Sequence, residues 1–218
     1  MLLKEYLQAP CRRLSIPYWK DKRIAVPENM KIVHQQAFDS RMLNDYTDER
    51  YFRLLHPLKN VRDRPLPGFS IRQAYPDDIP LMVKIINRSY TDLSVSCRQL
   101  EGYTRTEAYH TALWIIAVDE ANGCAAGCAI ADFDRQANEG ILEWVQVLPE
   151  YRRRGVGQRL VNALLCRMQE ADFATVSGKV DSFSNPESLY RRCGFEGEDI
   201  WHVLTAKQAA GKREGVSG

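Results

Sequence analysis

Apolar and polar positions follow two different periods from residue 69 onward. An apolar residue at every second position predicts a strand, and a spacing of three to four predicts an amphipathic helix. The patterns predict the order β-α-α-β-β-β-α-β-α-β, with strands at 69–73, 113–118, 124–133, 140–147, 173–180 and 199–204, and helices from 77 or 78, near 97–109, at 158–170 and at 186–192. The pair Asn122-Gly123 is a strong hairpin signal. The order therefore predicts a mixed α/β (α+β) fold.

Residues 1–68 show a different pattern. This stretch holds six of the ten prolines, which disfavours long regular elements, yet it also contains many large apolar side chains that need burial. We expect short pieces, with one helix near Asp48–His56, packed on the main domain. The sequence thus predicts an irregular N-terminal extension at 1–68, a core domain at 69–207 and a flexible tail at 208–218. The extension could form a lid, but structural packing is favoured.

Composition limits the class of protein. A chain of 218 residues with 44% hydrophobic content can bury one full core, and a net charge of +2 gives no sign of a nucleic-acid partner. No apolar run is long enough for a bilayer, and the first residues lack the apolar core of a signal peptide. The six cysteines form no C-x-x-C pair, and Cys124 and Cys128 are expected to be small apolar filler of a strand. We expect a reduced cytoplasmic protein without a metal.

The most informative segment is VLPEYRRRGVG at 147–157. A predicted strand precedes it and a predicted helix follows it. Glycines let backbone N–H groups converge on a phosphate, the helix N-terminus attracts negative charge, and the arginines add charged hydrogen bonds. The loop is not a Walker loop, because Gln158 and Arg159 stand where Lys and Ser/Thr would be needed. Nor is it a dinucleotide fingerprint, since Leu160 replaces the third glycine.

The remaining spacing, V-x-P-x-x-R-x-x-G-x-G, resembles the acyl-CoA signature of the GNAT superfamily of N-acetyltransferases. A second segment, NPESLYRRCGF at 185–195, resembles the closing helix of the same family. Pro186 suits a first helical position with Asn185 or Ser184 as N-cap, and Gly194 suits the position after the helix. Asn185 is read either as a cofactor contact or as a simple cap. The resemblance covers roughly residues 69–205.

The resemblance implies a mostly antiparallel sheet whose middle strands, 140–147 and 173–180, splay apart to admit the pantetheine arm of acetyl-CoA. The Val147 N–H would stabilise the thioester oxyanion, and the backbone of 153–158 would hold the pyrophosphate. The implied cofactor-binding residues are Val145, Gln146, Val147, Arg152, Arg153, Arg154, Gly155, Val156, Gly157, Gln158, Asn185 and Tyr190.

Two residues are candidates for proton transfer. Tyr190 stands where the family often has the acid that protonates the CoA sulfur; the alternative is a packed tyrosine. Glu143 lies four residues before Val147, which predicts that both lie on the same face of the strand. A carboxylate within an apolar strand needs a role or a partner, so Glu143 is either the general base or a strand carboxylate that is salt-bridged or outward-facing.

The acceptor is less specified. Residues 90–112 are expected to bound its site, with Tyr90, Tyr103 and Tyr109 as candidate lining, while Trp144 and His202 contribute or pack in the core. The resemblance implies transfer of an acetyl or acyl group to a small-molecule amine or a protein amine, by a monomer or homodimer. A non-catalytic CoA-binding sensor or interaction module is the alternative. A nucleic-acid-binding role lacks any motif or broad basic face.

Overall fold

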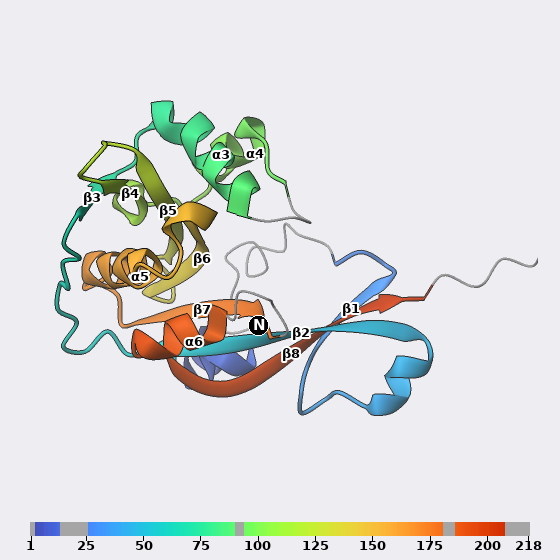
Figure 1. Ribbon diagram of the computed structural model, residues 1–218. Helices are drawn as coiled ribbons and strands as arrows, with labels where there is room; N and C mark the ends of the chain where they lie inside the picture. The colour runs from blue at the N-terminus through green and yellow to red at the C-terminus, as the bar shows by residue number, and fades with distance from the viewer. Residues whose placement is uncertain (1–2, 14–25, 90–93, 181–185, 208–218) are drawn as a thin grey trace, which may run out of the picture.

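The computed structural model describes residues 3–13, 26–89, 94–180 and 186–207. They build an eight-stranded sheet in the order β1-β8-β2-β7-β6-β5-β4-β3 (Figure 1). The strands are β1 Met30–His34, β2 Tyr46–His56, β3 Phe69–Gln73, β4 Trp114–Asp119, β5 Ala125–Asp134, β6 Glu139–Val147, β7 Phe173–Lys179 and β8 Glu196–Ala206. The helices are α1 Leu3–Gln8, α3 Ile79–Ser89, α4 Cys97–Tyr103, α5 Val156–Arg167 and α6 Pro186–Arg192, with short 3-10 turns between. Neighbouring strands are antiparallel except β6 and β7, so the predicted mixed, mostly antiparallel fold is confirmed.

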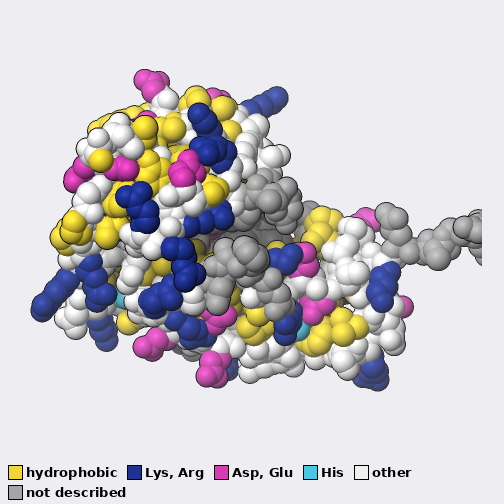
Figure 2. All heavy atoms as spheres, viewed as in Figure 1, with side chains coloured by type: hydrophobic (Ala, Val, Ile, Leu, Met, Phe, Trp, Pro, Cys, Tyr) yellow, Lys and Arg dark blue, Asp and Glu magenta, His cyan; other side chains and the backbone are white. Residues whose placement is uncertain are grey.

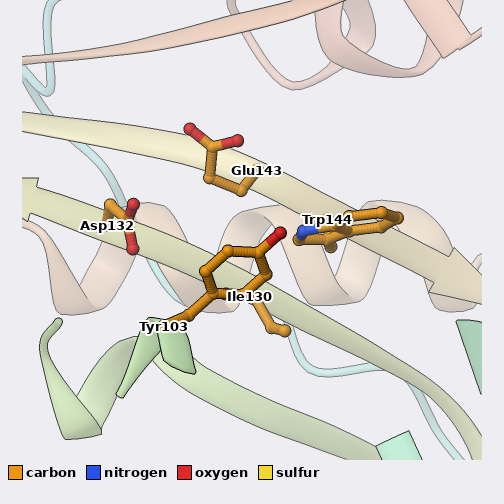
Figure 3. A pocket seen from close by; sticks show the side chains of 5 residues that line it. All are labelled: Tyr103, Ile130, Asp132, Glu143 and Trp144. Atoms are coloured by element: carbon orange, nitrogen blue, oxygen red, sulfur yellow. The ribbon is translucent and has the colours of Figure 1, made fainter. Parts of the chain in front are cut away.

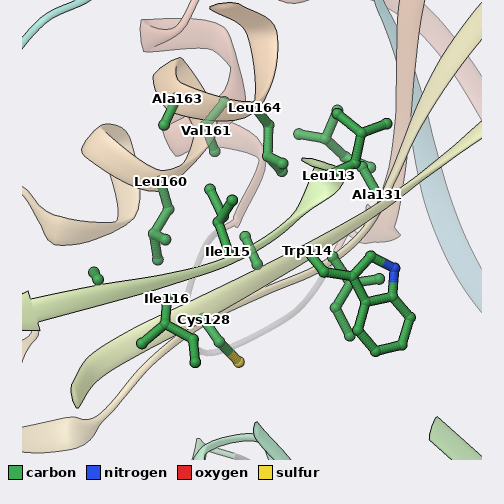
Figure 4. Packing of buried hydrophobic residues seen from close by; sticks show 14 of the residues in the cluster. Leu113, Trp114, Ile115, Ile116, Cys128, Ala131, Leu160, Val161, Ala163 and Leu164 are labelled. Carbon is green, nitrogen blue, oxygen red and sulfur yellow. The ribbon is translucent and has the colours of Figure 1, made fainter. Parts of the chain in front are cut away.

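One half of the sheet, β3–β6, is a meander of strands that are consecutive in the sequence. Helices α3 and α4 lie on one side of it and α5 on the other (Figure 1). Leu160, Val161 and Leu164 of α5 are buried and pack toward the β4 and β5 side chains, among them Ile115 (Figure 4). This spacing of three and four gives α5 a continuous apolar face, which fixes the position of its N-terminus.

The other half, β7-β2-β8-β1, joins strands that are distant in the sequence. Residues 46–56 form β2, which pairs with β7 on one side and β8 on the other. The prediction of a helix near Asp48–His56 is therefore wrong. Phe52 and Leu54 are buried to 1% and 0% exposure, and the backbone on both sides of the strand is hydrogen-bonded. Pairing along both edges overrides the weak local preference of this segment.

Three local expectations also differ from the structure. Helix α4 ends at Tyr103, well before residue 109. A glycine inside a strand often marks a bulge, which is the expectation for Gly178, but its register with Phe52 is regular, and a Cβ at Gly178 would lie 2.6 Å from the Phe52 ring atom Cζ. Cys128 is buried filler as expected, but Cys124 is exposed in the turn before β5. Within the part of the chain that the structure describes, no helix is long and apolar enough to cross a membrane.

Candidate active site

The two halves of the sheet separate between β6 and β7. These strands pair in parallel only from Glu139↔Phe173 to Leu142↔Val176. Beyond that point residues 143–147 of β6 have no β7 partner, and Figure 1 shows the halves diverging there. An unpaired strand edge presents N–H and C=O groups that need hydrogen-bond partners. The divergence lies between the strands for which the sequence predicted it.

The open edge of β6 has a defined direction. The Leu148 N–H donates to the Ala126 C=O at 3.0 Å, so it points toward β5. Because N–H groups alternate along a strand, the Val147 N–H points to the opposite, open edge. The Val147 C=O shares that side, where it accepts hydrogen bonds from Ser89 Oγ at 3.4 Å and Arg152 Nε at 3.2 Å. The same alternation turns the Val145 backbone toward the gap.

A β-bulge interrupts β6 at Glu143. Ile130 pairs with Trp144 and Ala131 with Leu142, which leaves Glu143 without an opposite residue. Bulges re-aim side chains and are common beside active sites. Glu143 and Trp144 are adjacent, yet both line one cavity, which an unbroken strand would not allow. The prediction that Glu143 lies on the same strand face as Val147 is therefore wrong, because the bulge interrupts the alternation between them.

The acidic cavity, as we name it, is lined by Tyr103, Ile130, Asp132, Glu143 and Trp144, and its volume is about 90 Å³. Figure 3 shows the Tyr103 ring from α4 approaching Glu143 and Trp144 of β6, with Asp132 of β5 nearby. The Glu143 side chain is exposed at the opening, while protein surrounds it elsewhere. Lost hydration, and then the neighbouring Asp132 carboxylate, raise the pKa of Glu143 to about 8, against the opposing effect of Arg53.

Tyr103 and Asp132 complete the electrostatics of the acidic cavity. Burial, followed by the charges of Glu143 and Asp132, raises the pKa of the Tyr103 hydroxyl, so this group remains a neutral donor. Tyr103 was among the predicted acceptor-lining residues. Asp132 was missed, although the signal that singled out Glu143 also applies to it: a carboxylate within an apolar strand. Asp132 is 2% exposed.

A buried ion pair supports β6 next to the acidic cavity. Glu139 is fully buried; it accepts hydrogen bonds from Tyr6 Oη at 2.6 Å and Thr175 Oγ1 at 2.5 Å, and it lies 3.5 Å from Arg53 Nη2. Buried charges need this degree of hydrogen bonding to offset their lost hydration. Tyr6 and Arg53 come from α1 and β2, so the first 68 residues contribute directly to the surroundings of Glu143.

The glycine loop follows the open edge of β6 and leads into α5. Gly155 has a φ of +85° and is the N-cap of α5. The Arg159 N–H donates to the Gly155 C=O at 3.0 Å. Helix geometry then leaves the N–H groups of Val156, Gly157 and Gln158 without an intrahelical acceptor. This arrangement is suited to a phosphate.

The three arginines of the loop have different positions. Arg152 donates to the Val147 C=O and, at 3.0 Å, to the Ser89 C=O, so it braces the loop against β6 and α3. The Arg154 guanidinium lies over the rings of Phe69 and Tyr151, 4.8 and 5.3 Å from their centroids. Arg153 has a φ of +63°. Two of the three side chains thus stabilise the loop itself.

Helix α6 lies beside the N-terminus of α5. A Cβ at Gly157 would be 3.3 Å from Leu189 Cδ2, which shows how closely the two helices approach. Tyr190 is 8% exposed, and its ring centroid lies 6.1 Å from that of Phe52 and 5.8 Å from that of Phe195. Packing of the Tyr190 ring is therefore established, whatever its hydroxyl does. Asn185 lies outside the described residues.

The other predicted acceptor residues do not line the acidic cavity. Tyr109 packs edge-to-face on Trp114 at 5.5 Å. His202 is buried, with Nδ1 2.8 Å from Asp48 Oδ2 and its ring stacked on Phe38. Tyr90 falls outside the described residues. In the ranges that the structure describes, no group of three His, Cys, Asp or Glu side chains is placed to hold a metal.

Comparisons with known proteins agree with this geometry. Residues 110–197 match the family model of an acetyltransferase (GNAT) domain, whereas no curated protein matches the sequence. The structure is similar to a GCN5-related N-acetyltransferase from Sphaerobacter thermophilus, with 18% identity over 85% of this chain and 62% of that chain, and a TM-score of 0.64. This chain thus spans less than two thirds of that protein.

Two further structures share the fold. One is a putative GNAT-family acetyltransferase from Novosphingobium aromaticivorans, with 15% identity over 85% of this chain and 71% of that chain, and a TM-score of 0.53. The other is the ribosomal-protein-S18-alanine N-acetyltransferase from Escherichia coli, with 19% identity over 66% of this chain and 97% of that chain, and a TM-score of 0.50. The resemblance predicted from the sequence is therefore confirmed: residues 110–197 match the model of an acetyltransferase (GNAT) domain, and the chain has the fold of the GCN5-related N-acetyltransferases.

Proposed function

We propose that this protein is an N-acyltransferase that transfers an acetyl group from acetyl-CoA to a primary amine by direct attack in a ternary complex. One observation carries the proposal: the open edge of β6 ends at the N-terminus of α5, and Glu143 projects from that strand into a cavity beside the edge. The strand edge suits the amides of the pantetheine arm, the helix N-terminus suits the pyrophosphate, and the cavity suits an amine.

Acetyl-CoA, the acyl carrier, binds mainly through backbone groups of the protein. Val145 and Val147 face the pantetheine arm, with Gln146 between them. The N–H and C=O of Val145 pair with pantetheine amides, whereas the Val147 C=O already accepts from Ser89 and Arg152 and Val147 contributes its N–H. The backbone N–H groups from Arg153 to Gln158 hold the pyrophosphate, and Arg152 keeps this loop in place through its two carbonyl contacts. Asn185 remains a proposed contact at the start of α6.

The reaction needs a neutral amine, because an alkyl ammonium has a pKa near ~10 in water. Glu143, directly or through water, removes the proton; a carboxylate whose pKa is about 8 is a stronger base than an ordinary one. The amine nitrogen then attacks the thioester carbon, and the Val147 N–H stabilises the oxyanion. The C–S bond breaks as Tyr190 donates a proton to the departing sulfur, and the amide and free CoA result.

The acceptor is a small-molecule amine or an amine of a protein. The Escherichia coli relative is named for an alanine of ribosomal protein S18, so peptide amines belong in a test panel beside small amines. The free cysteines of the described chain accord with a reducing compartment, and we propose the cytoplasm.

The first test is a thermal-shift titration with acetyl-CoA, CoA and ATP as a control nucleotide. A ligand that binds only the folded state raises its stability, so we expect shifts with acetyl-CoA and CoA and none with ATP. An amine panel with thiol detection then follows. Binding without thiol release from any amine would favour the alternative of a non-catalytic CoA-binding module. Absence of a shift with both CoA species would contradict the cradle.

A further inference from the structure

A second cavity lies on the α6 side of the molecule. It is bounded by the loop that joins β2 to β3, by α5 from Gln158 to Leu165 and by the C-terminal end of α6, and its volume is about 280 Å³. We name it the basic cavity after four of its lining residues, Lys59, Arg62, Arg64 and Arg192. Figure 2 shows Lys and Arg side chains gathered at the lower left, over the loop between β2 and β3 in Figure 1.

These four cations face no acidic residue in the lining of the basic cavity. Among the described residues, none of the four side chains makes a salt bridge, and two of the acids nearby pair with other arginines, while Glu196 lies close enough to His56 of the lining to oppose the lowering of its pKa by burial. Asp63 pairs with Arg159, and Glu187 pairs with Arg191 at 2.7 Å. Like charges around one cavity repel each other, so a bound anion would relieve unfavourable electrostatic energy.

The loop of the basic cavity is fixed in place. The side chain of Asn162 on α5 accepts a hydrogen bond from the Arg64 N–H at 2.8 Å and donates one to the Arg62 C=O at 3.0 Å. Asn162 is 8% exposed. Earlier in the loop, the Leu58 N–H donates to His56 Nδ1 at 2.9 Å. A loop held in this way loses little freedom when a ligand binds, which favours affinity.

The basic cavity and the proposed pyrophosphate cradle share one residue, Gln158. Gln158 belongs to the first turn of α5, where the free N–H groups lie, and it also lines the basic cavity. A ligand with a pyrophosphate at this turn and a further phosphate beyond it would meet both features. CoA has this chemistry, because its ribose carries a phosphate monoester with a charge of about −1.5 to −2.

We propose that the basic cavity binds the 3′-phosphate of CoA through Arg62 and Arg64, so that the protein distinguishes CoA from dephospho-CoA. This inference rests on the proposed function, since it places the third phosphate of the same carrier. It also gives the first 68 residues a role in selecting the carrier.

The test compares the affinities of CoA and dephospho-CoA by calorimetry. Charged hydrogen bonds to a phosphate predict that the protein binds CoA at least about tenfold more tightly. The double variant Arg62→Gln, Arg64→Gln should bring this ratio close to one and leave dephospho-CoA affinity unchanged, because Asn162 holds only backbone atoms of the loop. Arg98→Gln, an exposed arginine of α4, is the matched control and should keep the ratio.

Each result has one interpretation. Equal affinities in the wild type, or a ratio that survives in the double variant, would overturn the inference and leave the proposed function standing. If neither CoA species bound, the proposed function would fail as well. Adenosine 3′,5′-bisphosphate should compete with CoA in the wild type and compete less in the double variant. Inorganic phosphate that binds the cavity without weakening CoA would assign it to a separate anion and overturn the inference.

Discussion

The acidic and basic cavities concentrate opposite charges by different physical means. In the acidic cavity, the buried Asp132 carboxylate lies near Glu143 at the opening, and the pKa of Glu143 is raised to about 8 by lost hydration and then by the Asp132 charge. In the basic cavity, the guanidinium groups are exposed at the rim and keep their charge, because arginine does not lose its proton in proteins. Two neighbouring carboxylates thus give a group that exchanges protons, whereas guanidinium groups supply fixed charges.

This difference matches the two ends of the proposed reaction. An amine must be attracted as a cation and then lose a proton, which requires a titratable partner. The phosphates of a carrier only need to be held, which requires permanent charge and free N–H groups. The open edge of β6 lies between the two groups that would do this. The bulge at Glu143 is near one end of the edge, and the N-terminus of α5 is beyond the other.

The sharpest test of the acidic side is Glu143→Gln. We expect kcat/KM at neutral pH to fall by about 10²–10⁴-fold, the usual contribution of a positioned acid or base. In the wild type, activity should rise with pH as Glu143 deprotonates near pH 8. In the variant, the defect should shrink toward alkaline pH, where the amine deprotonates without help. Rates measured from pH 6 to pH 10 provide the check.

Glu101→Gln removes an exposed carboxylate from α4 and serves as the control for lost charge. A defect of Glu143→Gln that stays constant across the whole pH range would reject Glu143 as the base. The acidic cavity would then be a feature of packing.

The corresponding test of the carrier side is Gly157→Val. The Cβ of this residue would lie 3.3 Å from Leu189 Cδ2, and its methyl groups would crowd the first turn of α5. We expect CoA affinity to fall by about 100-fold, or two factors of ten in Kd. Gly102→Val is the control, since a Cβ at Gly102 meets nothing within 4 Å. A folded Gly157→Val protein with unchanged CoA affinity would sink the cradle assignment.

The two halves of the sheet differ in how far the sequence predicts them. Strands β3–β6 pair with their neighbours in the sequence, so apolar period and the Asn122-Gly123 turn were enough to place them. Strand β2 has its partners β7 and β8 far along the chain, and its edges are satisfied only in the folded sheet. No local signal at 46–56 contains that information, which explains why a helix was expected there.

The same division applies to the candidate sites. The glycine loop was predictable because its strand, glycines and helix are contiguous. Arg62 and Arg64 approach Arg192 only because β2 brings their loop against α5 and α6, so no motif reveals the basic cavity. Asp132 was within reach of the sequence argument, but its closeness to Glu143 depends on the β5–β6 register and the bulge.

A smaller effect is expected from Tyr190→Phe. This variant tests whether Tyr190 donates a proton to the departing CoA sulfur. The ring should keep its contacts with Phe52 and Phe195, so thermal stability should change little. Loss of the donor to the thiolate should lower kcat by about tenfold or more at unchanged CoA affinity. Tyr109→Phe, a tyrosine packed on Trp114, is the matched control. Unchanged kcat with a lower melting temperature would favour the packed alternative.

The finest test concerns the coupling of the two carboxylates, through Asp132→Asn. Asp132 raises the pKa of Glu143, so its neutralisation should lower that pKa and move the midpoint of the pH–rate profile down by about one unit. The same raised pKa also makes the stability of the fold depend on pH. A carboxyl with a pKa raised on folding binds more protons in the folded state, so its contribution to stability falls as pH rises from the unfolded pKa toward 8. In Asp132→Asn this fall should end at a lower pH. The Glu101→Gln control should leave the midpoint of the pH–rate profile in place. An unmoved midpoint in Asp132→Asn would mean that lost hydration alone, and not the second carboxylate, raises the pKa of Glu143.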